Sequence, residues 1–252
     1  MAVACDDLCS HTWVDGAVIT AASCKTTGSQ KRVCSKCGAE GTPKTLAIAE
    51  HNHFESLICK YTSCDHQYEL GDTGPAGGII FYVNATGFKL YQGAVTTSVN
   101  AEADNDTYIT AHYLEAWTEN GGTRVWSSTN VDVPQAEQEY TALGDWIGYG
   151  LRNTRIIVAA LENAGENNRA AQVASSVKGG YNDWFLPSID ELYAMYIAKA
   201  DPNNVAGLPA GTNWWSSSQS DDTARELNFN DGSMGATVKP NTMRNHRAVR
   251  AF

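Results

Sequence analysis

The sequence predicts an α+β protein in which a small Cys/His-rich module precedes one larger domain. All seven cysteines lie before residue 65, and four of the six histidines lie before residue 67. Beyond this boundary, strand-like segments are followed by three helix-like segments and then by strands again, a grouping typical of α+β folds. We therefore assign residues 1–68 to the module and 69–252 to the domain.

The composition argues against two classes of protein. The formal net charge is -10, whereas a nucleic-acid-binding protein needs a basic face to contact phosphates. No apolar run approaches the roughly 18 residues that a membrane-spanning helix requires. Hydrophobic residues make up 42% of the chain, and seven residues are Trp, which is enough for a packed core.

The module contains a repeated cysteine pattern. A cysteine pair that ends in Cys-x-His occurs at 5–11 and again at 59–66. Between the two copies, Cys34-Ser35-Lys36-Cys37-Gly38 has the form of a zinc turn, which points two thiolates at one ion. A module of this size cannot bury enough apolar surface to fold alone, so a metal or disulfides are expected.

We expect structural zinc, with disulfides as the alternative. The predicted ligands of one tetrahedral site are Cys24, Cys34 and Cys37 with His51 or His53. The predicted ligands of the second site are drawn from Cys9, His11, Cys59, Cys64 and His66. No general base lies close to these residues in the sequence, so a catalytic metal is not expected.

The seventh cysteine has two interpretations. Ala2-Val3-Ala4-Cys5 resembles the end of a bacterial lipobox, in which small residues precede a lipidated cysteine. The charged and hydrophobic leader of a lipoprotein precursor is absent, so a lipid anchor at Cys5 would require a chain that begins near a mature terminus. In the alternative interpretation, Cys5 is simply the first cysteine of the repeated pattern.

The large domain begins with a turn followed by strands. Residues 71–78 are rich in Gly and Pro, and 79–83 form an apolar run that predicts a buried strand. The next strand is predicted at 88–95. Residues 96–150 are predicted to be mostly loop with short turns of helix.

Three helices are predicted next. Asn153 or Thr154 can cap the first, which ends at Gly165. A weaker one covers 169–177. The third follows Pro187, where Ser188 and Glu191 have the spacing of a capping box.

The last 39 residues, 214–252, combine two stiff ends with a polar middle. The ends, WWSSS and RAVRAF, are predicted strands, and Arg247 and Arg250 are expected to make scaffold hydrogen bonds or buried ion pairs. The predicted apolar anchors of the middle are Ala224, Leu227, Phe229, Gly232 and Val238. The polar residues between these anchors show no catalytic pattern, which favours a scaffold that displays side chains for binding.

Four motifs of the domain, in order, resemble those of a known family. They are GDTGPAGGIIF at 71–81, GYNDWFLPSIDEL at 180–192, WSSS at 215–218 and RAVRAF at 247–252. The Lcl/DUF1566 group of C-type-lectin-like domains, related in fold to the formylglycine-generating enzymes, has similar motifs. The resemblance covers roughly 69–252 and implies small antiparallel sheets, flanking helices and long loops.

The C-terminal arrangement is similar to a narrower group, the variable proteins of diversity-generating retroelements. Between WSSSQ and RAVRAF, the anchors are Ala224, Phe229, Gly232 and Lys239. In this group, adenine-directed mutagenic copying rewrites selected codons of a C-terminal segment, here 214–252, while scaffold residues persist. Asn template codons account for most of the polar residues here, although not for Glu226, Met234 or Met243. The alternative is an ordinary polar loop region of a lectin-like domain.

The resemblance implies a non-enzymatic protein that binds a macromolecule, most often a protein. We expect it at the cell surface or secreted, or else on a virion. The alternative is a structural surface or adhesin component with no diversification. The predicted ligand contacts are Ser220, Asp221, Asp222, Thr223, Arg225, Glu226, Asn228, Ser233, Met234, Thr237, Asn241, Met243, Arg244, Asn245 and His246.

Enzymatic function is not expected. The formylglycine-generating relatives need active-site cysteines, and the large domain has none. Neither His112 nor His246 lies in a nucleophile or metal motif. The Glu-Pro-Asn and Trp-Asn-Asp triplets of calcium-dependent lectins are absent. A loop such as 104–106, Asp-Asn-Asp, is the place for structural calcium, but nothing else in the sequence supports that ion.

Overall fold

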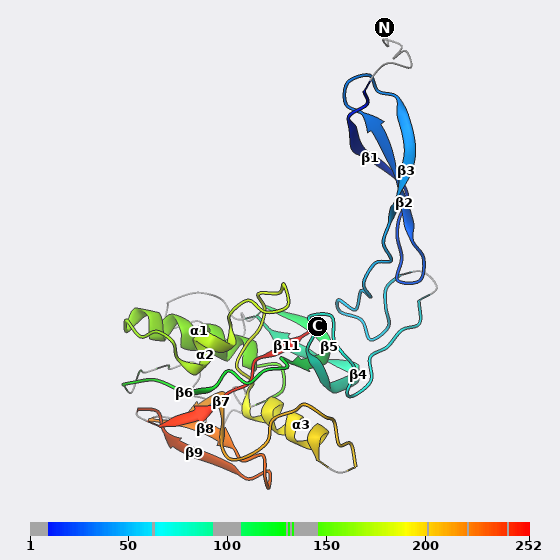
Figure 1. The fold of residues 1–252 in the computed structure, drawn as a ribbon. Helices are drawn as coiled ribbons and strands as arrows, with labels where there is room; N and C mark the ends of the chain where they lie inside the picture. The colour runs from blue at the N-terminus through cyan, green and yellow to red at the C-terminus, as the bar shows by residue number, and fades with distance from the viewer. Residues whose placement is uncertain are drawn as a thin grey trace. The chain divides into compact units, whose positions relative to one another are not determined.

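The computed structural model describes residues 10–61, 64–92, 107–129, 131, 133, 146–200, 202–220, 222–240 and 242–252. Helices and small sheets are both present, which confirms the α+β prediction (Figure 1). The chain divides into two compact units. The first comprises Met1–His53 and Ile58–His66, and the second comprises Phe54–Leu57 and Gln67–Phe252. Among the described residues, no helix is long and apolar enough to span a membrane.

The first unit is built on a three-stranded antiparallel sheet. Its strands are β1 (Trp13–Thr20), β2 (Gly28–Cys34) and β3 (Glu40–Leu46), with β2 in the centre. Most side chains of β1 and β3 are exposed. Two layers of side chains are needed to make a hydrophobic core, so this thin sheet is not stabilised in that way.

The second unit contains two sheets. A three-stranded sheet has the order β11-β5-β4, formed by β4 (Ile79–Tyr91), β5 (Tyr108–Ala116) and β11 (Val249–Ala251). A five-stranded sheet has the order β6-β10-β7-β8-β9. Its strands are β6 (Thr123–Val125), β7 (Trp214–Ser220), β8 (Thr223–Leu227), β9 (Met234–Val238) and β10 (Met243–Asn245). The strand β9 therefore lies at one edge of this sheet.

Two strand predictions need correction. Residues 79–83 and 88–91 belong to one long strand, β4, which pairs with β5 and has a register shift between Val83 and Phe88. Residues 93–95 of the predicted second strand lie outside the described residues. The segment 108–116, predicted as loop, is the strand β5. Its buried Glu115 hides the strand pattern in the sequence, because an acidic residue is buried only when a partner compensates its charge.

Three helices accompany the sheets: α1 (Gly150–Asn163), α2 (Ala170–Ala174) and α3 (Ile189–Lys199). The capping box predicted for α3 is confirmed. The cap predicted for α1 is wrong, because that helix begins at Gly150 and has no side-chain cap. Thr154 lies in its buried first turn, where its hydroxyl bonds the backbone of Leu186. The α2 helix is shorter than the predicted 169–177.

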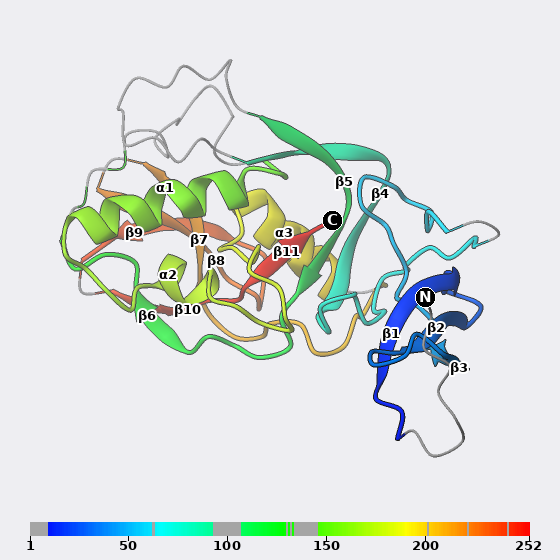
Figure 2. The ribbon, with the colours of Figure 1, turned by 90° about the horizontal axis from the view of Figure 1, so that it is seen from above.

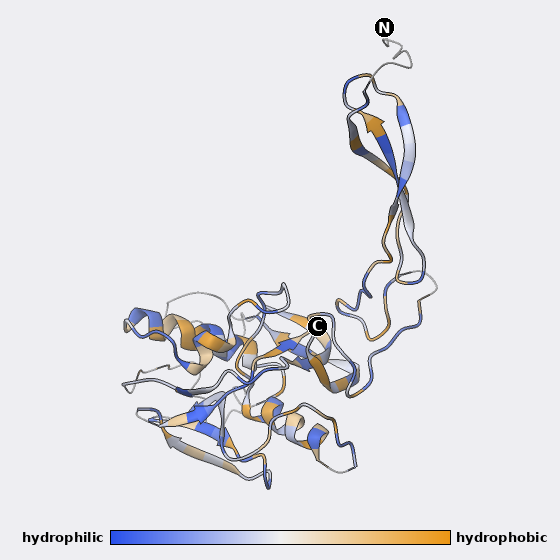
Figure 3. Cartoon of the chain, viewed as in Figure 1, coloured by the Kyte–Doolittle hydropathy of each residue, from blue (hydrophilic) through white to orange (hydrophobic). Residues whose placement is uncertain are grey.

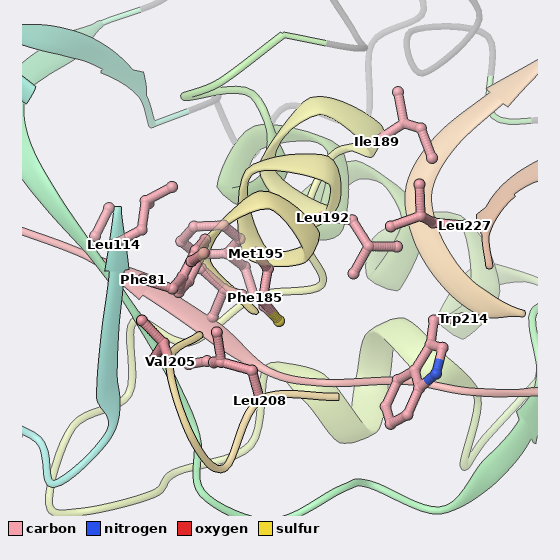
Figure 4. Packing of buried hydrophobic residues seen from close by; sticks show 14 of the residues in the cluster. Phe81, Leu114, Phe185, Ile189, Leu192, Met195, Val205, Leu208, Trp214 and Leu227 are labelled. Atoms are coloured by element: carbon pink, nitrogen blue, oxygen red, sulfur yellow. The ribbon is translucent and has the colours of Figure 1, made fainter. Parts of the chain in front are cut away.

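The helices pack on both sheets and create two clusters of core residues. One cluster joins α3 to strands of both sheets, through residues such as Phe81, Leu192 and Leu227 (Figure 4). The other joins α1 and α2 to Trp126, Trp184 and Trp215. Figure 2 shows α1 above the five-stranded sheet, with which it is in contact at β7. Figure 3 shows hydrophobic residues along α1 and α3. Each buried large apolar side chain stabilises the fold by about 1.5–3 kcal/mol.

Candidate functional site

Three of the four family-like motifs meet at one buried ion-pair network. Glu115, in β5, accepts backbone hydrogen bonds from Ala76 (3.3 Å) and Gly78 (3.1 Å) of the 71–81 motif. Its other carboxylate oxygen lies 2.9 Å from Arg250 Nη1 in the RAVRAF motif. Arg250 Nε lies 2.7 Å from Asp183 of the 180–192 motif. These motif residues therefore hold the scaffold together.

The glycines of the first motif allow this approach. A Cβ atom on Gly74 would lie 2.4 Å from a carboxylate oxygen of Glu115, which is closer than real atoms come. The Arg250 guanidinium also lies 3.9 Å from the centroid of the Tyr181 ring. The buried Glu115 charge is therefore compensated by one arginine nitrogen and two backbone donors, and the same arginine also binds Asp183.

The WSSS motif supports the amino-terminal end of α3. The backbone N–H of Ser217 donates to Pro187 O at 2.7 Å, and Ser218 Oγ accepts from the N–H of Ile189 at 3.0 Å. Both serines are fully buried. Ser216 Oγ donates to the carbonyl of Arg225 in β8 at 2.9 Å. The hydroxyls of Ser216 and Ser218 thus form hydrogen bonds within the fold.

Buried Glu191 completes this support. Its carboxylate accepts backbone hydrogen bonds from Gly148 (2.8 Å), Gly150 (3.4 Å) and Ser188 (2.8 Å). Burial raises the pKa of Glu191 to about 7, against the opposing effect of these donors. The carboxylate links the turn before α1 to the beginning of α3.

The C-terminal segment contrasts buried ends with an exposed edge. In β7, every residue from Trp214 to Gln219 is buried, and β11 is buried throughout. The predictions for both stiff ends are confirmed. In β9, by contrast, four of the five residues are exposed. We call 230–238, which contains β9 and the turn before it, the β9 edge.

The predicted ligand contacts differ in exposure. The exposed ones are Asp222, Ser233, Met234 and Met243. The partly buried ones are Ser220, Thr223, Arg225, Asn228, Thr237, Arg244 and Asn245. Asp221 and Asn241 lie outside the described residues. The expectation that the whole set faces solvent is wrong for the remaining two, His246 and Glu226.

His246 is 1% exposed. Its ring packs so closely against Gly121 that a Cβ atom there would lie 2.0 Å from Nε2. Burial, with a contribution from the charge of Arg124, lowers the pKa of His246 to about 4. Glu226 is 7% exposed, and its carboxylate bonds Arg244 Nε (2.6 Å) and Asn213 Nδ2 (2.5 Å). Both residues therefore belong to the scaffold.

The anchors of the middle part are mostly as predicted. Ala224, Leu227 and Phe229 are buried, but Val238 is 56% exposed and is not an anchor. The neighbouring Lys239 is 1% exposed, and its amine lies 5.1 Å from the centroid of the Trp126 ring. Lysine can be buried in this way when its amine has such a partner. Arg247 donates to the carbonyls of Trp117 and Gly207, as expected for a scaffold residue.

Two groups of Cys and His side chains converge in the first unit. Potential ligand atoms of His11, Cys34 and Cys37 lie within 4.8 Å of one another, and we call these residues cluster A. The hydrogen bond from His11 lowers the pKa of Cys34 to about 6, which favours the thiolate form that binds metals. His11 is exposed and Cys34 is buried.

The second group is richer in ligands. Potential ligand atoms of Cys24, His51, Cys59 and Cys64 lie within 4.8 Å of one another, and we call these residues cluster B. Cys24 and Cys64 are joined as a disulfide in the structure. His53 and His66 adjoin the cluster, with 3.0 Å between His53 Nε2 and His66 Nδ1. His51, His53 and His66 also form a possible ligand group of their own.

These clusters correct the predicted partition of the ligands. Cys24 lies with Cys59 and Cys64, and His11 lies with Cys34 and Cys37. The pairing of Trp13 with Cys34 brings His11 to one end of β2, whereas Cys24 lies in the connection at the other end. Sequence proximity was misleading because an extended strand separates Cys24 from Cys34. Cys5, Cys9 and the 104–106 loop lie outside the described residues.

A cavity of about 110 Å³ is lined by residues that include Trp117, Lys178 and His246. The Lys178 amine donates to the carbonyls of Val173 and Ala174, at 3.0 and 2.8 Å, and to Ser176. Burial lowers the pKa of Lys178 to about 8. The amine closes the end of α2, which is a structural role. His112 is also satisfied by the fold, through a contact of 2.9 Å between Nδ1 and Asn84 O.

Comparison with models of known protein families gives no match, and comparison with curated protein sequences gives none either.

Proposed function

We propose that the second unit is a non-enzymatic binding domain of the C-type-lectin-like, Lcl/DUF1566 type, and that its C-terminal segment presents a variable surface to a macromolecule, most often a protein. The single observation that carries this proposal is the contrast within 214–252. Strands β7 and β11 are buried, whereas β9, from the same segment, is exposed.

This contrast suits a surface that must change while the fold persists. Substitutions of exposed side chains usually change stability by less than about 0.5 kcal/mol, so the β9 edge can vary at little cost. Met234 and Met243 are 40% and 54% exposed, and flexible methionines adapt to different partners. Exposed Ser233 and Asp222 can supply polar contacts.

Variation by a diversity-generating retroelement is part of the same proposal. It predicts a second copy of the 214–252 coding segment near the gene, beside a reverse transcriptase gene. The two copies should differ only where the template carries adenine. Sequencing the surrounding DNA tests this directly, and a single unvaried copy with no reverse transcriptase gene would contradict it.

A library experiment tests the display surface itself. Ser233, Met234, Thr237 and Met243 are randomised together, and the fraction of folded variants is measured by resistance to protease. The matched control library randomises the buried Trp215, Ser218, Ala224 and Val249. We expect most variants of the first library, and few of the second, to fold. Equal intolerance in both would instead favour a structural surface or adhesin component whose surface does not vary.

We also propose that the Cys/His clusters of the first unit hold structural zinc. Thiolates and imidazoles in groups of three or four are the usual ligands of this ion. A surface, secreted or virion-borne protein fits the proposed binding role.

A further inference from the structure

We infer that the first unit binds two zinc ions at separate sites, one in cluster A and one in cluster B, and that cluster A releases its ion first. This inference rests on the zinc proposal above and is independent of the proposed display surface. It assigns each ligand to one ion, and it predicts a different rate of release for each ion.

The first step concerns what stabilises the unit. Among its described residues, the buried ones are Gly28, Cys34, His53, Cys59 and Cys64. Large apolar side chains are on the outside, for example Val18 (53% exposed) and Ile48 (54%). Four of the five buried residues are therefore cysteine or histidine. A unit without an apolar core needs covalent or metal links to be stable.

The second step shows that one ion cannot serve both clusters. A thiolate lies about 2.3 Å from zinc, so two thiolates on one ion lie within about 4.6 Å of each other. The seven residues of β2 separate the end that carries Cys34 from the connection that carries Cys24. Such a strand is about 20 Å long at its usual rise. Two ions are required.

The third step concerns cluster B, which has a full set of ligands. Three thiolates and one imidazole match a closed, tetrahedral structural site. Cys59 and Cys64 are 4% and 7% exposed, so water has little access. The His51 ring stacks on His66, with 3.7 Å between centroids, and His66 is in turn 3.0 Å from His53. The stack limits the rotation of the His51 ring.

The alternative, a disulfide, joins only two of the four residues of cluster B. A Cys24–Cys64 bond accounts for two of the thiols and leaves the buried Cys59 thiol and the His51 imidazole beside it without a common role. A zinc ion uses all four groups.

The fourth step concerns cluster A. The described residues supply three ligands, and one of them, His11, is exposed. A site with a solvent-exposed ligand exchanges its ion faster than one with mostly buried thiolates. We therefore expect a chelator to remove the cluster A ion before the cluster B ion.

The test uses the full chain purified under reducing conditions, with zinc counted by native mass spectrometry. We expect two ions in the wild type, one in Cys34→Ser, one in Cys24→Ser and none in the double variant. The control is Lys36→Ala, an exposed position in the Cys34–Cys37 turn, which should keep both ions. If Cys24 and Cys34 shared one ion, the double variant would retain the other.

Cobalt substitution identifies which site each variant retains. The thiolate-to-cobalt absorption should be stronger in Cys34→Ser, which retains three thiolates, than in Cys24→Ser, which retains two. Should a serine variant lose both ions by unfolding, His11→Cys and His51→Cys decide the matter. Each variant should still bind two ions. In His11→Cys, the thiolate-to-cobalt absorption of the rapidly released ion should increase. In His51→Cys, the absorption of the slowly released ion should increase.

Two results would overturn the inference in different ways. A chain purified under reducing conditions that binds no zinc, and a sample purified without reductant in which only three thiols from this unit's described cysteines react, would together support the Cys24–Cys64 disulfide and reject zinc altogether. A chain that binds two ions but keeps one in the double variant would preserve the zinc proposal and reject this partition. Neither result bears on the library experiment, which tests the display surface separately.

Discussion

Strands β7 and β9 belong to the same sheet and are separated only by β8, yet their surroundings are opposite. Both α1 and α3 contact β7, and its serines bond the backbone around α3. In β9, the outer edge of the sheet leaves most side chains exposed. The comparison teaches that neighbouring parts of one segment can have different tolerance to mutation. Position in the sheet decides which side chains are exposed.

The largest effect is expected from the scaffold side of this comparison. Replacing Arg250 with Met leaves the buried Glu115 charge without its partner, which should lower the free energy of unfolding by about 3–5 kcal/mol. Urea unfolding measures this. The matched control is Arg244→Met, whose partner Glu226 keeps a bond to Asn213. A loss in Arg250→Met no larger than in Arg244→Met would show that the motif network is not the main support of the fold.

A smaller effect should accompany acidification. The pKa of His246 is lowered by burial to about 4, against about 6.5 in an unfolded chain. The unfolded chain therefore binds the proton more readily. The contribution of His246 to the free energy of unfolding is fully present above about pH 6.5. As the pH falls towards 4, that contribution is lost, and the free energy of unfolding decreases by roughly 3 kcal/mol.

The comparison of wild type with His246→Gln isolates this contribution. The variant should be less dependent on pH between 6.5 and 4 when the free energy of unfolding is measured at several pH values. If wild type and His246→Gln had the same pH profile, the His246 ring would be accessible to solvent. His246 would then again be a candidate ligand contact.

The next effect concerns β7 alone. Ser218→Ala removes the acceptor for the buried N–H of Ile189, and an unsatisfied buried donor costs about 1–3 kcal/mol. Ser233→Ala, on the β9 edge, is the matched control and should change stability much less. Thermal unfolding of both variants gives the comparison. A similar loss in both would mean that the serines of β7 are no more structural than those of the β9 edge.

The smallest effect should be found in β9. Met234→Lys places a charge on a side chain that is 40% exposed, so the free energy of unfolding should change by less than about 0.5 kcal/mol. Chemical unfolding measures this value, with Leu227→Lys as a buried control in the neighbouring strand. A large loss in Met234→Lys would contradict the view that β9 can vary freely.

Local patterns in the sequence were reliable where neighbouring residues decide the structure. The capping box of Ser188 and Glu191 is an example, because all its atoms come from one turn of helix. The buried strands at both ends of 214–252 are another. The strand β5 was missed because its buried Glu115 is compensated by Arg250, 135 residues away.

Within the polar middle of 214–252, side-chain burial depends on contacts that cannot be inferred from spacing in the sequence. His246 is buried because Gly121 leaves room for its ring, and Lys239 is buried against Trp126. Val238, which looked like an anchor, faces outwards at the edge of the sheet. For His246 and Lys239, the deciding neighbour belongs to a distant part of the chain.

The sequence by itself determined the α+β class, the concentration of cysteine and histidine near the amino terminus, and the stiff ends of the last segment. These depend on composition and on short-range periodicity, which are properties of neighbouring residues. Only the tertiary structure decided which cysteines meet and which polar side chains are exposed. The reason is physical: strand pairing brings distant residues together and, over the length of β2, separates Cys24 from Cys34.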